Sequence, residues 1–138
     1  MSGVEAEVLL AGECDGPTLV LDEPLSFWGG VDPASGQIID ANHPQVGARL
    51  GGRVVVMPGS RGSSGTPGAL AEALRLGTGP LGVVVTHADA NLVTGALVAL
   101  KLYEVACPVV LVEQAAFGAV AAARRVAIAP DGAITLGS

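Results

Sequence analysis

Residues 53–65 of the chain read RVVVMPGSRGSSG, and Thr66-Pro67 follow directly. The run of β-branched residues at its start is typical of a strand that is buried on both faces. The glycine-rich segment over 59–65 predicts a turn, and Thr66-Pro67 predicts a helix N-cap followed by proline at the first helical position. Apolar residues then recur at helical spacing up to Gly77, which predicts the end of the helix. This stretch therefore predicts a strand, a polar turn and a helix.

The same alternation continues on both sides of this stretch. Towards the C-terminus the sequence predicts strands over 81–86 and 108–112, helices over 90–103 and 115–123, and a closing hairpin over 125–129 and 133–136. Towards the N-terminus it predicts strands over 4–11, 17–22 and 37–41, an Asp15-Gly16 turn, and loops over 24–36 and 42–52. Strands that alternate with helices are typical of parallel strands joined by crossover helices. Because the helices are too few to cover both faces of a doubly wound sheet, we expect an α/β fold of three layers, β/β/α, in a single domain over 1–138.

The composition excludes several classes of protein. The chain has 138 residues, of which 50% are hydrophobic and 14% charged, so it suits one globular domain rather than a disordered tail. Its net charge of −6 disfavours nonspecific binding to nucleic acid or to an anionic membrane. The acidic start MSGVEAEV lacks the pattern of a signal peptide, and every apolar run is interrupted before it reaches the length of a membrane span. We therefore expect a cytoplasmic protein with no nucleic-acid or membrane partner.

Cysteine usage bears on metal binding. Cys14 and Cys107 are the two cysteines of the chain, and they lie far apart in the sequence. They are too few to hold a structural zinc ion or an iron–sulfur cluster by thiolates, and nothing in the sequence requires a disulfide between them. We therefore expect no metal site within this chain.

The segment Arg61-Gly62-Ser63-Ser64-Gly65 is the strongest local candidate for chemistry. Backbone N–H groups at a helix N-terminus stabilise a phosphate, a carboxylate or an alkoxide, and Arg61 adds a cation that can grip an anion. A serine hydroxyl acts as a base only if such donors hold its alkoxide in a dry site. The segment lacks the Gly-Lys-Ser/Thr of a phosphate-binding loop and the Gly-x-Ser-x-Gly of a nucleophile elbow. The alternative interpretation is a turn that only caps the helix.

A second candidate is the loop over 26–33, which reads SFWGGVDP. Phe27 and Trp28 beside two glycines suit a surface that lies close to a partner or a substrate. The alternative is a loop that its own aromatic residues pin to the core. The histidines, His43 and His87, are interpreted as loop residues that make hydrogen bonds, although His87 follows a predicted parallel strand where ligands gather.

These segments belong to a longer series of motifs over 24–64, within a resemblance that extends from about Ala11 to Val112. The series comprises PLSFWGGVDP (24–33), GQIID (36–40), His43-Pro44, Gly47, Gly52-Arg53 and RGSS (61–64). It closely resembles the small subunit, or swivel domain, of the aconitase X family. The resemblance implies a swivelling β/β/α domain like the mobile domain of aconitase.

The resemblance also implies an activity and a division of labour. The enzyme would be a hydro-lyase built from this chain and a large subunit, and the large subunit would hold the iron–sulfur cluster, whose iron acts as Lewis acid on the leaving hydroxyl of a small hydroxy acid. The matching base here is Ser63, or Ser64 if the register differs by one. Arg61 and the helix N-terminus would stabilise negative charge, and Gly62 and Gly65 would bind the substrate. The resemblance places Trp28, Gly29 and Gly30 in the same cleft or at the subunit seam.

Two activities of the family compete for this chain. They are the dehydration of cis-3-hydroxy-L-proline and the dehydration of mevalonate 5-phosphate. The Ala-, Gly-, Val- and Arg-rich composition is typical of a GC-rich bacterial source and favours the proline derivative, whereas a phosphorylated substrate calls for more cationic groups. A hypothesis of another class is a non-catalytic interaction module that docks a partner through the 26–33 loop. A third is a free-standing binder of phosphate or carboxylate that uses the 59–65 turn.

Overall fold

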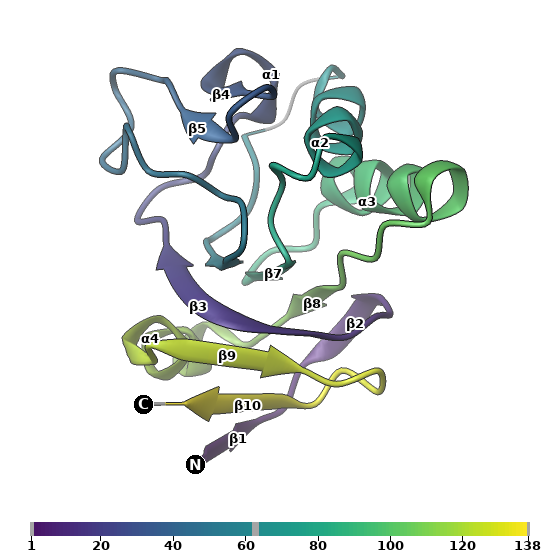
Figure 1. Ribbon diagram of the computed structural model, residues 1–138. Coiled ribbons are helices and arrows are strands. Elements are labelled where there is room, and N and C mark those ends of the chain that lie inside the picture. The colour runs from purple at the N-terminus through teal and green to yellow at the C-terminus, as the bar shows by residue number, and fades with distance from the viewer. Residues whose placement is uncertain (1, 62–63, 138) are drawn as a thin grey trace.

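The computed structural model describes residues 2–61 and 64–137, and these residues form a curled sheet with helices on both of its faces (Figure 1). In sheet order the strands are β1 (Ser2–Val4), β10 (Ile134–Gly137), β9 (Arg125–Ile128), β3 (Cys14–Val20), β6 (Val54–Val56), β7 (Gly82–Val85), β8 (Val109–Leu111) and β2 (Glu7–Leu10). The helices are α1 (Phe27–Gly30), α2 (Thr66–Arg75), α3 (Ala90–Tyr103) and α4 (Gln114–Ala122). A separate two-stranded ribbon contains β4 (Val31–Asp32) and β5 (Gln37–Ile38). The predicted order of strands and helices is thus confirmed in the middle of the chain.

The centre of the sheet consists of parallel strands whose valines face two different cores. Strands β3, β6, β7 and β8 pair in parallel. Along β6, Val55 belongs to one hydrophobic cluster while Val54 and Val56 belong to the other. Successive side chains of a strand point to opposite faces, so a continuous valine run is what a strand with two buried faces requires.

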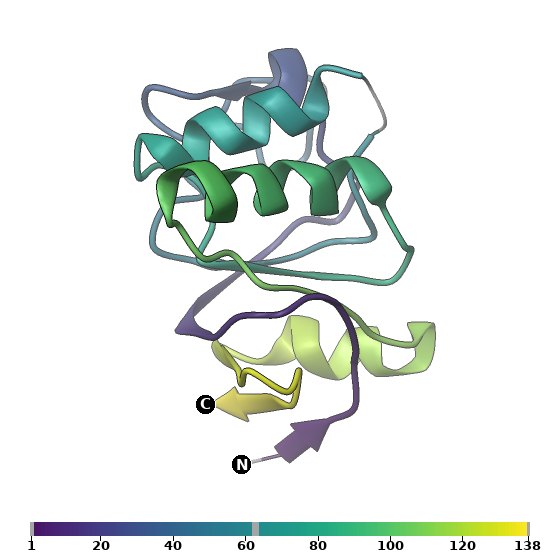
Figure 2. The ribbon, with the colours of Figure 1, turned by 90° about the vertical axis from the view of Figure 1, so that its right-hand side faces the viewer.

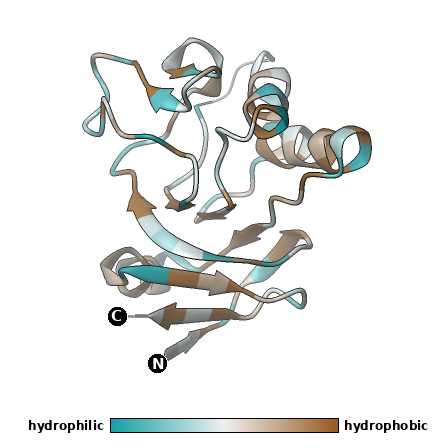
Figure 3. Cartoon of the chain, in the orientation of Figure 1, coloured by the Kyte–Doolittle hydropathy of each residue, from teal (hydrophilic) through white to brown (hydrophobic). Residues whose placement is uncertain are grey.

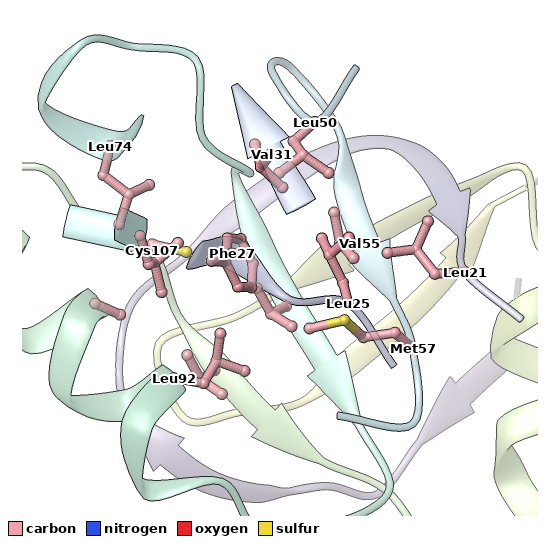
Figure 4. Packing of buried hydrophobic residues seen from close by; sticks show 14 of the residues in the cluster. Leu21, Leu25, Phe27, Val31, Leu50, Val55, Met57, Leu74, Leu92 and Cys107 are labelled. Atoms are coloured by element: carbon pink, nitrogen blue, oxygen red, sulfur yellow. The ribbon is translucent and has the colours of Figure 1, made fainter. Parts of the chain in front are cut away.

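Each core lies against its own helices. Helices α2 and α3 pack side by side over one face of the sheet, and α4 lies on the opposite side (Figure 2). The core beneath α2 and α3 contains Phe27 and Met57, and Figure 4 shows Phe27 pointing into it. The core on the side of α4 contains Val120 and the inward residues of β9 and β10. Figure 3 shows that the C-terminal end of β3 is hydrophobic. In the two-stranded ribbon, β5 combines the polar Gln37 with the buried Ile38.

The N-terminal segment covers both edges of the sheet. Strand β1 pairs antiparallel with β10 at one edge, and β2 pairs antiparallel with β8 at the other. The two strands are joined by Glu5 and Ala6, so one stretch of chain bridges the two edges. An exposed edge strand invites pairing with another chain, and the shortness of β1 and β2, the two edge strands, limits that exposure.

Three predicted features differ from the structure. Asp15 and Gly16, expected as a turn, lie inside β3, where Gly16 pairs with Val126. Gly16 is buried, and a Cβ added to it would lie 2.6 Å from Leu81 Cδ1, so this glycine serves close packing rather than a turn. The predicted strand over 4–11 is divided between β1 and β2, and the predicted loop over 24–36 contains the short α1 and β4.

Candidate functional site

The glycine-rich segment leaves the sheet at the end of β6. The backbone of Ser60 forms an isolated parallel bridge with Leu25, and the Arg61 N–H donates to the Leu25 carbonyl at 2.8 Å. The Leu25 N–H in turn donates to the Gly59 carbonyl at 3.3 Å. These bonds join the start of the serine-bearing segment to the chain that leads into the Trp28 loop.

Helix α2 begins one residue earlier than the sequence predicts. Gly65 is the N-cap, Thr66 is the first helical residue and Pro67 the second. The predicted capping role of Thr66 was therefore wrong: its side chain is completely buried, and its hydroxyl has no hydrogen-bond partner among the described residues. The predicted end of the helix is confirmed, since Gly77 follows α2 with a left-handed φ of 77°.

The predicted serines divide between described and undescribed parts of the chain. Ser63 and Gly62 lie outside the described residues, so their assigned roles stay predictions. Ser64 is exposed and directly precedes Gly65 at the start of α2. The positive end of the α2 dipole is therefore adjacent in the chain to both serines.

Trp28 lies over the start of α2. A Cβ added to Gly65 would lie 2.8 Å from Trp28 Cγ, so only a glycine leaves room for the root of the indole. Trp28 is 66% exposed, whereas its neighbour Phe27 is 2% exposed in the core. Phe27 therefore pins the loop to the core, whereas Trp28 presents an exposed aromatic surface; its contact with a partner or a substrate stays a prediction.

An apolar groove of about 520 Å³ lies beside this indole. It is lined by Phe27, Trp28, Gly29, Val31, Pro33, Gly65, Gly68, Ala69 and Glu72. Gly29 is exposed with a left-handed φ of 81°, and Gly30 is buried with its carbonyl accepting the Ile39 N–H at 2.9 Å. The groove thus brings together Trp28, Gly29 and Gly65 from the predicted site, while Gly30 supports the loop from inside.

Arg61 is held away from the core. Its Nη2 lies 3.8 Å from Glu23 Oε1, and both side chains are more than half exposed. An exposed pair of this kind contributes about 0–1 kcal/mol, so Arg61 can exchange Glu23 for an anionic ligand at little cost.

The histidines make the loop hydrogen bonds that the sequence favours. His43 is buried; its Nε2 lies 3.2 Å from the Glu23 carbonyl, and its Nδ1 accepts the Gln45 N–H at 3.0 Å. His87 is exposed after β7, with Nδ1 3.1 Å from the Thr86 hydroxyl. Both nitrogens of His43 thus contact backbone groups, one in its own loop and one at Glu23, which makes it a structural residue.

Sequence reasoning missed the contact between Ser60 and Asp89. Asp89 Oδ2 accepts the Ser60 N–H at 2.8 Å and also the Ser60 hydroxyl, while Oδ1 accepts the Leu92 N–H at 3.1 Å. An aspartate directly before an apolar helix is a signal for an N-cap and could have been found. The bond to Ser60 joins residues 29 positions apart and has no local signal.

With this geometry in place, comparison with known families decides the relationship. The family model described as the aconitase X swivel domain matches residues 3–136. The chain belongs to the aconitase X swivel domain family. The match confirms the resemblance carried by the PLSFWGGVDP and RGSS motifs.

Curated relatives of this swivel domain carry two names. Over 101 residues it is 40% identical to cis-3-hydroxy-L-proline dehydratase of Pseudomonas aeruginosa, covering 73% of this chain and 17% of that protein. Over 96 residues it is 38% identical to the phosphomevalonate dehydratase small subunit of Methanothermobacter thermautotrophicus, covering 70% of this chain and 73% of that subunit. The swivel domain therefore spans less than a fifth of the first relative and most of the second.

A solved structure confirms the predicted fold. The swivel domain superposes on Thermococcus kodakaraensis aconitase X, holo-form, with a TM-score of 0.84 at 24% identity, covering 100% of both chains. The predicted three-layer α/β architecture of the aconitase swivel kind is thus confirmed. None of the helices in the described residues has the length and apolar character that crossing a bilayer requires.

The residues of this swivel domain do not fit an iron–sulfur cluster. Within residues 2–61 and 64–137 no group of three or more His, Cys, Asp or Glu side chains is placed to hold a metal. Burial raises the pKa of the Cys14 thiol to about 11 and that of the Cys107 thiol to about 12. A cluster ligand must be a thiolate, and both thiols stay protonated at neutral pH.

Proposed function

We propose that this swivel domain is the small part of a dehydratase and supplies the base that removes a proton from a small hydroxy acid. The support is the RGSS motif at the junction of β6 and α2, beside a groove capped by an exposed indole. The relatives from Pseudomonas aeruginosa and Methanothermobacter thermautotrophicus are both named as dehydratases or their subunits. The motif at that junction carries the proposal.

Ser63 is the proposed base, and Ser64 is the residue that replaces it if the register differs by one. The serine alkoxide takes the proton from the carbon next to the substrate carboxylate, and the electron pair of that C–H bond forms a carbon–carbon double bond. The C–O bond on the neighbouring carbon breaks, and the hydroxyl takes up one proton from solvent and leaves as water. The serine then returns its proton to solvent, so the net reaction is the loss of one water. Atoms and charge balance without an oxidant or a reductant.

The surroundings of the serines stabilise negative charge in this proposal. The positive end of α2 begins at Gly65, and Arg61 can leave its exposed partner Glu23 to face an anion. Gly62 and Gly65 let the backbone approach the ligand closely. A serine hydroxyl is deprotonated near neutral pH only where such donors stabilise its alkoxide.

The groove beside Trp28 gives the domain a surface on which the larger part of the enzyme closes. Its lining is mostly apolar, and Trp28 is its most exposed aromatic residue. We place Gly29 beside Trp28 at this seam and Gly30 beneath it. Closure over the groove would exclude water from the serines and bring them to the substrate.

The proposed partner is a large aconitase X subunit, which holds the iron–sulfur cluster that this chain cannot ligate. Residues 1–138 act as a single swivel domain in this assignment. The free thiols Cys14 and Cys107 suit a reducing compartment, so we place the enzyme in the cytoplasm, without nucleic-acid or membrane partners.

The proposed substrate is cis-3-hydroxy-L-proline. Its ring suits an apolar groove, and its single carboxylate needs fewer cations than a phosphorylated substrate; the chain has a net charge of −6, and Arg61 shares its charge with Glu23. Mevalonate 5-phosphate is the second candidate. The observation that favours it is the 73% coverage of a separate small subunit of phosphomevalonate dehydratase.

Co-expression of the full chain with a large aconitase X subunit tests the proposal. Purified complex is incubated with each hydroxy acid, and loss of one water is followed by mass spectrometry. We expect turnover of cis-3-hydroxy-L-proline and little of mevalonate 5-phosphate. A complex that forms but dehydrates neither compound would contradict the proposal, and would favour a docking module that uses the 26–33 loop.

A further inference from the structure

Asp89 connects the ends of two neighbouring parallel strands. It follows β7 and precedes α3, and Ser60 follows β6. We propose that Asp89 is a positioning residue of the dehydratase: through Ser60 it holds the segment that carries Ser63 and Ser64. This inference rests on the proposed function, because the contact between Asp89 and Ser60 matters for the reaction only if Ser63 or Ser64 takes part in it.

The two oxygens of the Asp89 carboxylate have separate partners. Oδ1 accepts the Leu92 N–H at 3.1 Å and caps α3. Oδ2 accepts two hydrogens from Ser60, the backbone N–H at 2.8 Å and the side-chain hydroxyl. A helix cap needs one oxygen only, so the contact between Oδ2 and Ser60 is additional to capping.

Ser60 connects Asp89 to both segments of the candidate site, the one that carries Trp28 and the one that carries the serines. It is paired with Leu25, and the next residue, Arg61, donates its N–H to the Leu25 carbonyl at 2.8 Å. Leu25 leads within three residues to Trp28, and Ser60 leads within four to Ser64. Hydrogen bonds to a carboxylate are about twice as strong as those between neutral groups, so a half-buried Asp89 is a firm anchor for both segments.

Loss of Asp89 should affect the reaction by displacing the segment that carries the serines. A displacement of about 1 Å at a reacting group can reduce a rate by about 10²-fold, even when the altered residue does not touch substrate. Asp89 contacts Ser60 in the base-bearing segment and acts on the serines through this contact. Its loss should therefore slow the chemical step and leave substrate affinity nearly unchanged.

Substitutions that keep the helix cap separate the two roles of Asp89. Asp89→Asn and Asp89→Ser both retain an oxygen that can cap α3, but neither retains the second carboxylate oxygen that Ser60 uses. Asp131→Asn is the matched control: it removes the same charge, and Asp131 accepts the Ala133 N–H at 2.9 Å in the β9–β10 turn, at the opposite end of the molecule from α2 (Figure 1).

Amide hydrogen exchange on the full chain measures the contact without any activity assay. The Ser60 amide should exchange about tenfold faster in both Asp89 variants than in the wild type, while amides in the middle of α3 keep their protection. The Asp131→Asn protein should match the wild type at Ser60. Unchanged exchange at Ser60 in both Asp89 variants would overturn the anchoring contact itself.

Kinetics of the complex with the large subunit test the positioning role. We expect kcat to fall about 10- to 100-fold for Asp89→Asn and Asp89→Ser, with KM within about threefold of the wild type. Adding Ser60→Ala to Asp89→Asn should lower kcat by no more than about twofold further, because both changes act on the same contact. An active wild-type complex with full kcat in both Asp89 variants would overturn this inference alone, whereas an inactive wild-type complex would overturn the proposed function.

Discussion

Helices α2 and α3 begin at equivalent places in the fold but begin in different ways. Each follows a buried valine strand of the same parallel sheet, and Figure 2 shows the two helices side by side with their N-terminal ends on the same side. Helix α3 is capped by the carboxylate of Asp89, whereas the N-cap of α2 is Gly65, which has no side chain. At the start of α3, the side chain of Asp89 accepts a backbone N–H of the first turn. At the start of α2, Gly65 has no side chain, which leaves room for other groups to approach the helix.

The first turns of the two helices show the same contrast. In α3 the Thr94 hydroxyl donates to the Ala90 carbonyl at 2.7 Å. In α2 the Thr66 hydroxyl is buried without a hydrogen-bond partner among the described residues, and the indole of Trp28 lies over Gly65. The start of α3 is therefore built for helix stability, and the start of α2 is shaped by what lies against it.

Removal of the proposed base, which precedes α2, should produce the largest effect. It tests whether the start of α2 has a function that the start of α3 lacks. Ser63→Ala in the complex should lower kcat by about 10²- to 10⁴-fold, which is the usual contribution of a general base. Ser64→Ala should lower kcat by less than tenfold, which corresponds to less than about 1.4 kcal/mol of transition-state stabilisation. Steady-state kinetics on the purified complex measure both.

The two serine variants serve as controls for each other. Both should still co-purify with the large subunit in size-exclusion chromatography, since each substitution removes only one hydroxyl group. A large loss in Ser64→Ala with little loss in Ser63→Ala would move the role of base to Ser64. Full turnover in both variants would show that this segment does not supply the base.

Much of this contrast could be predicted from the sequence because it follows from local patterns. Unbroken valine runs identify β6, β7 and β8 as strands with two buried faces, and the spacing of apolar residues identifies α3 with its bounds, 90–103. Motif order predicts the family, which the match over 3–136 confirms. The local sequence pattern was sufficient to predict an element wherever the structure of a segment is decided by its own residues.

The remaining features depend on contacts between distant segments. Thr66 has the composition of a cap, but its side chain is buried, so the preceding Gly65 takes that position. Gly16 has the appearance of a turn residue, but the close approach of Leu81 places it within a strand. The contact between Ser60 and Asp89 depends on the pairing of β6 with β7, which brings the ends of the two strands together. In each case the deciding partner is far away in the chain.

The close approach of Trp28 to Gly65 can be tested with a single methyl group. Gly65→Ala places a Cβ 2.8 Å from Trp28 Cγ and should lower the free energy of unfolding by about 1–3 kcal/mol through overpacking. Trp28 is the only tryptophan of the chain, so its fluorescence should report the displacement directly. Urea unfolding of the full chain gives the stability change.

Gly68→Ala is the matched control for that substitution. It adds the same methyl group inside α2 where no atom lies within 4 Å, so it should leave tryptophan fluorescence unchanged and raise the free energy of unfolding by up to about 1 kcal/mol. Replacing Trp28 with Ala in the Gly65→Ala protein should recover most of the lost stability. Equal stability changes in the two single glycine variants would refute close packing at Gly65.

The smallest expected effect concerns the two threonines. Thr66→Val removes a buried hydroxyl that has no hydrogen-bond partner among the described residues and keeps the shape of the side chain. Because burial of an unpaired hydroxyl costs about 1–3 kcal/mol, this variant should be more stable than the wild type by about 1 kcal/mol. Thr94→Val removes an exposed hydroxyl bonded within its own helix, and its stability should change by less than about 0.5 kcal/mol. Urea unfolding distinguishes the two outcomes. A loss of stability in Thr66→Val would mean that the folded protein pairs this hydroxyl, and the start of α2 would then resemble that of α3 more closely than the described contacts indicate.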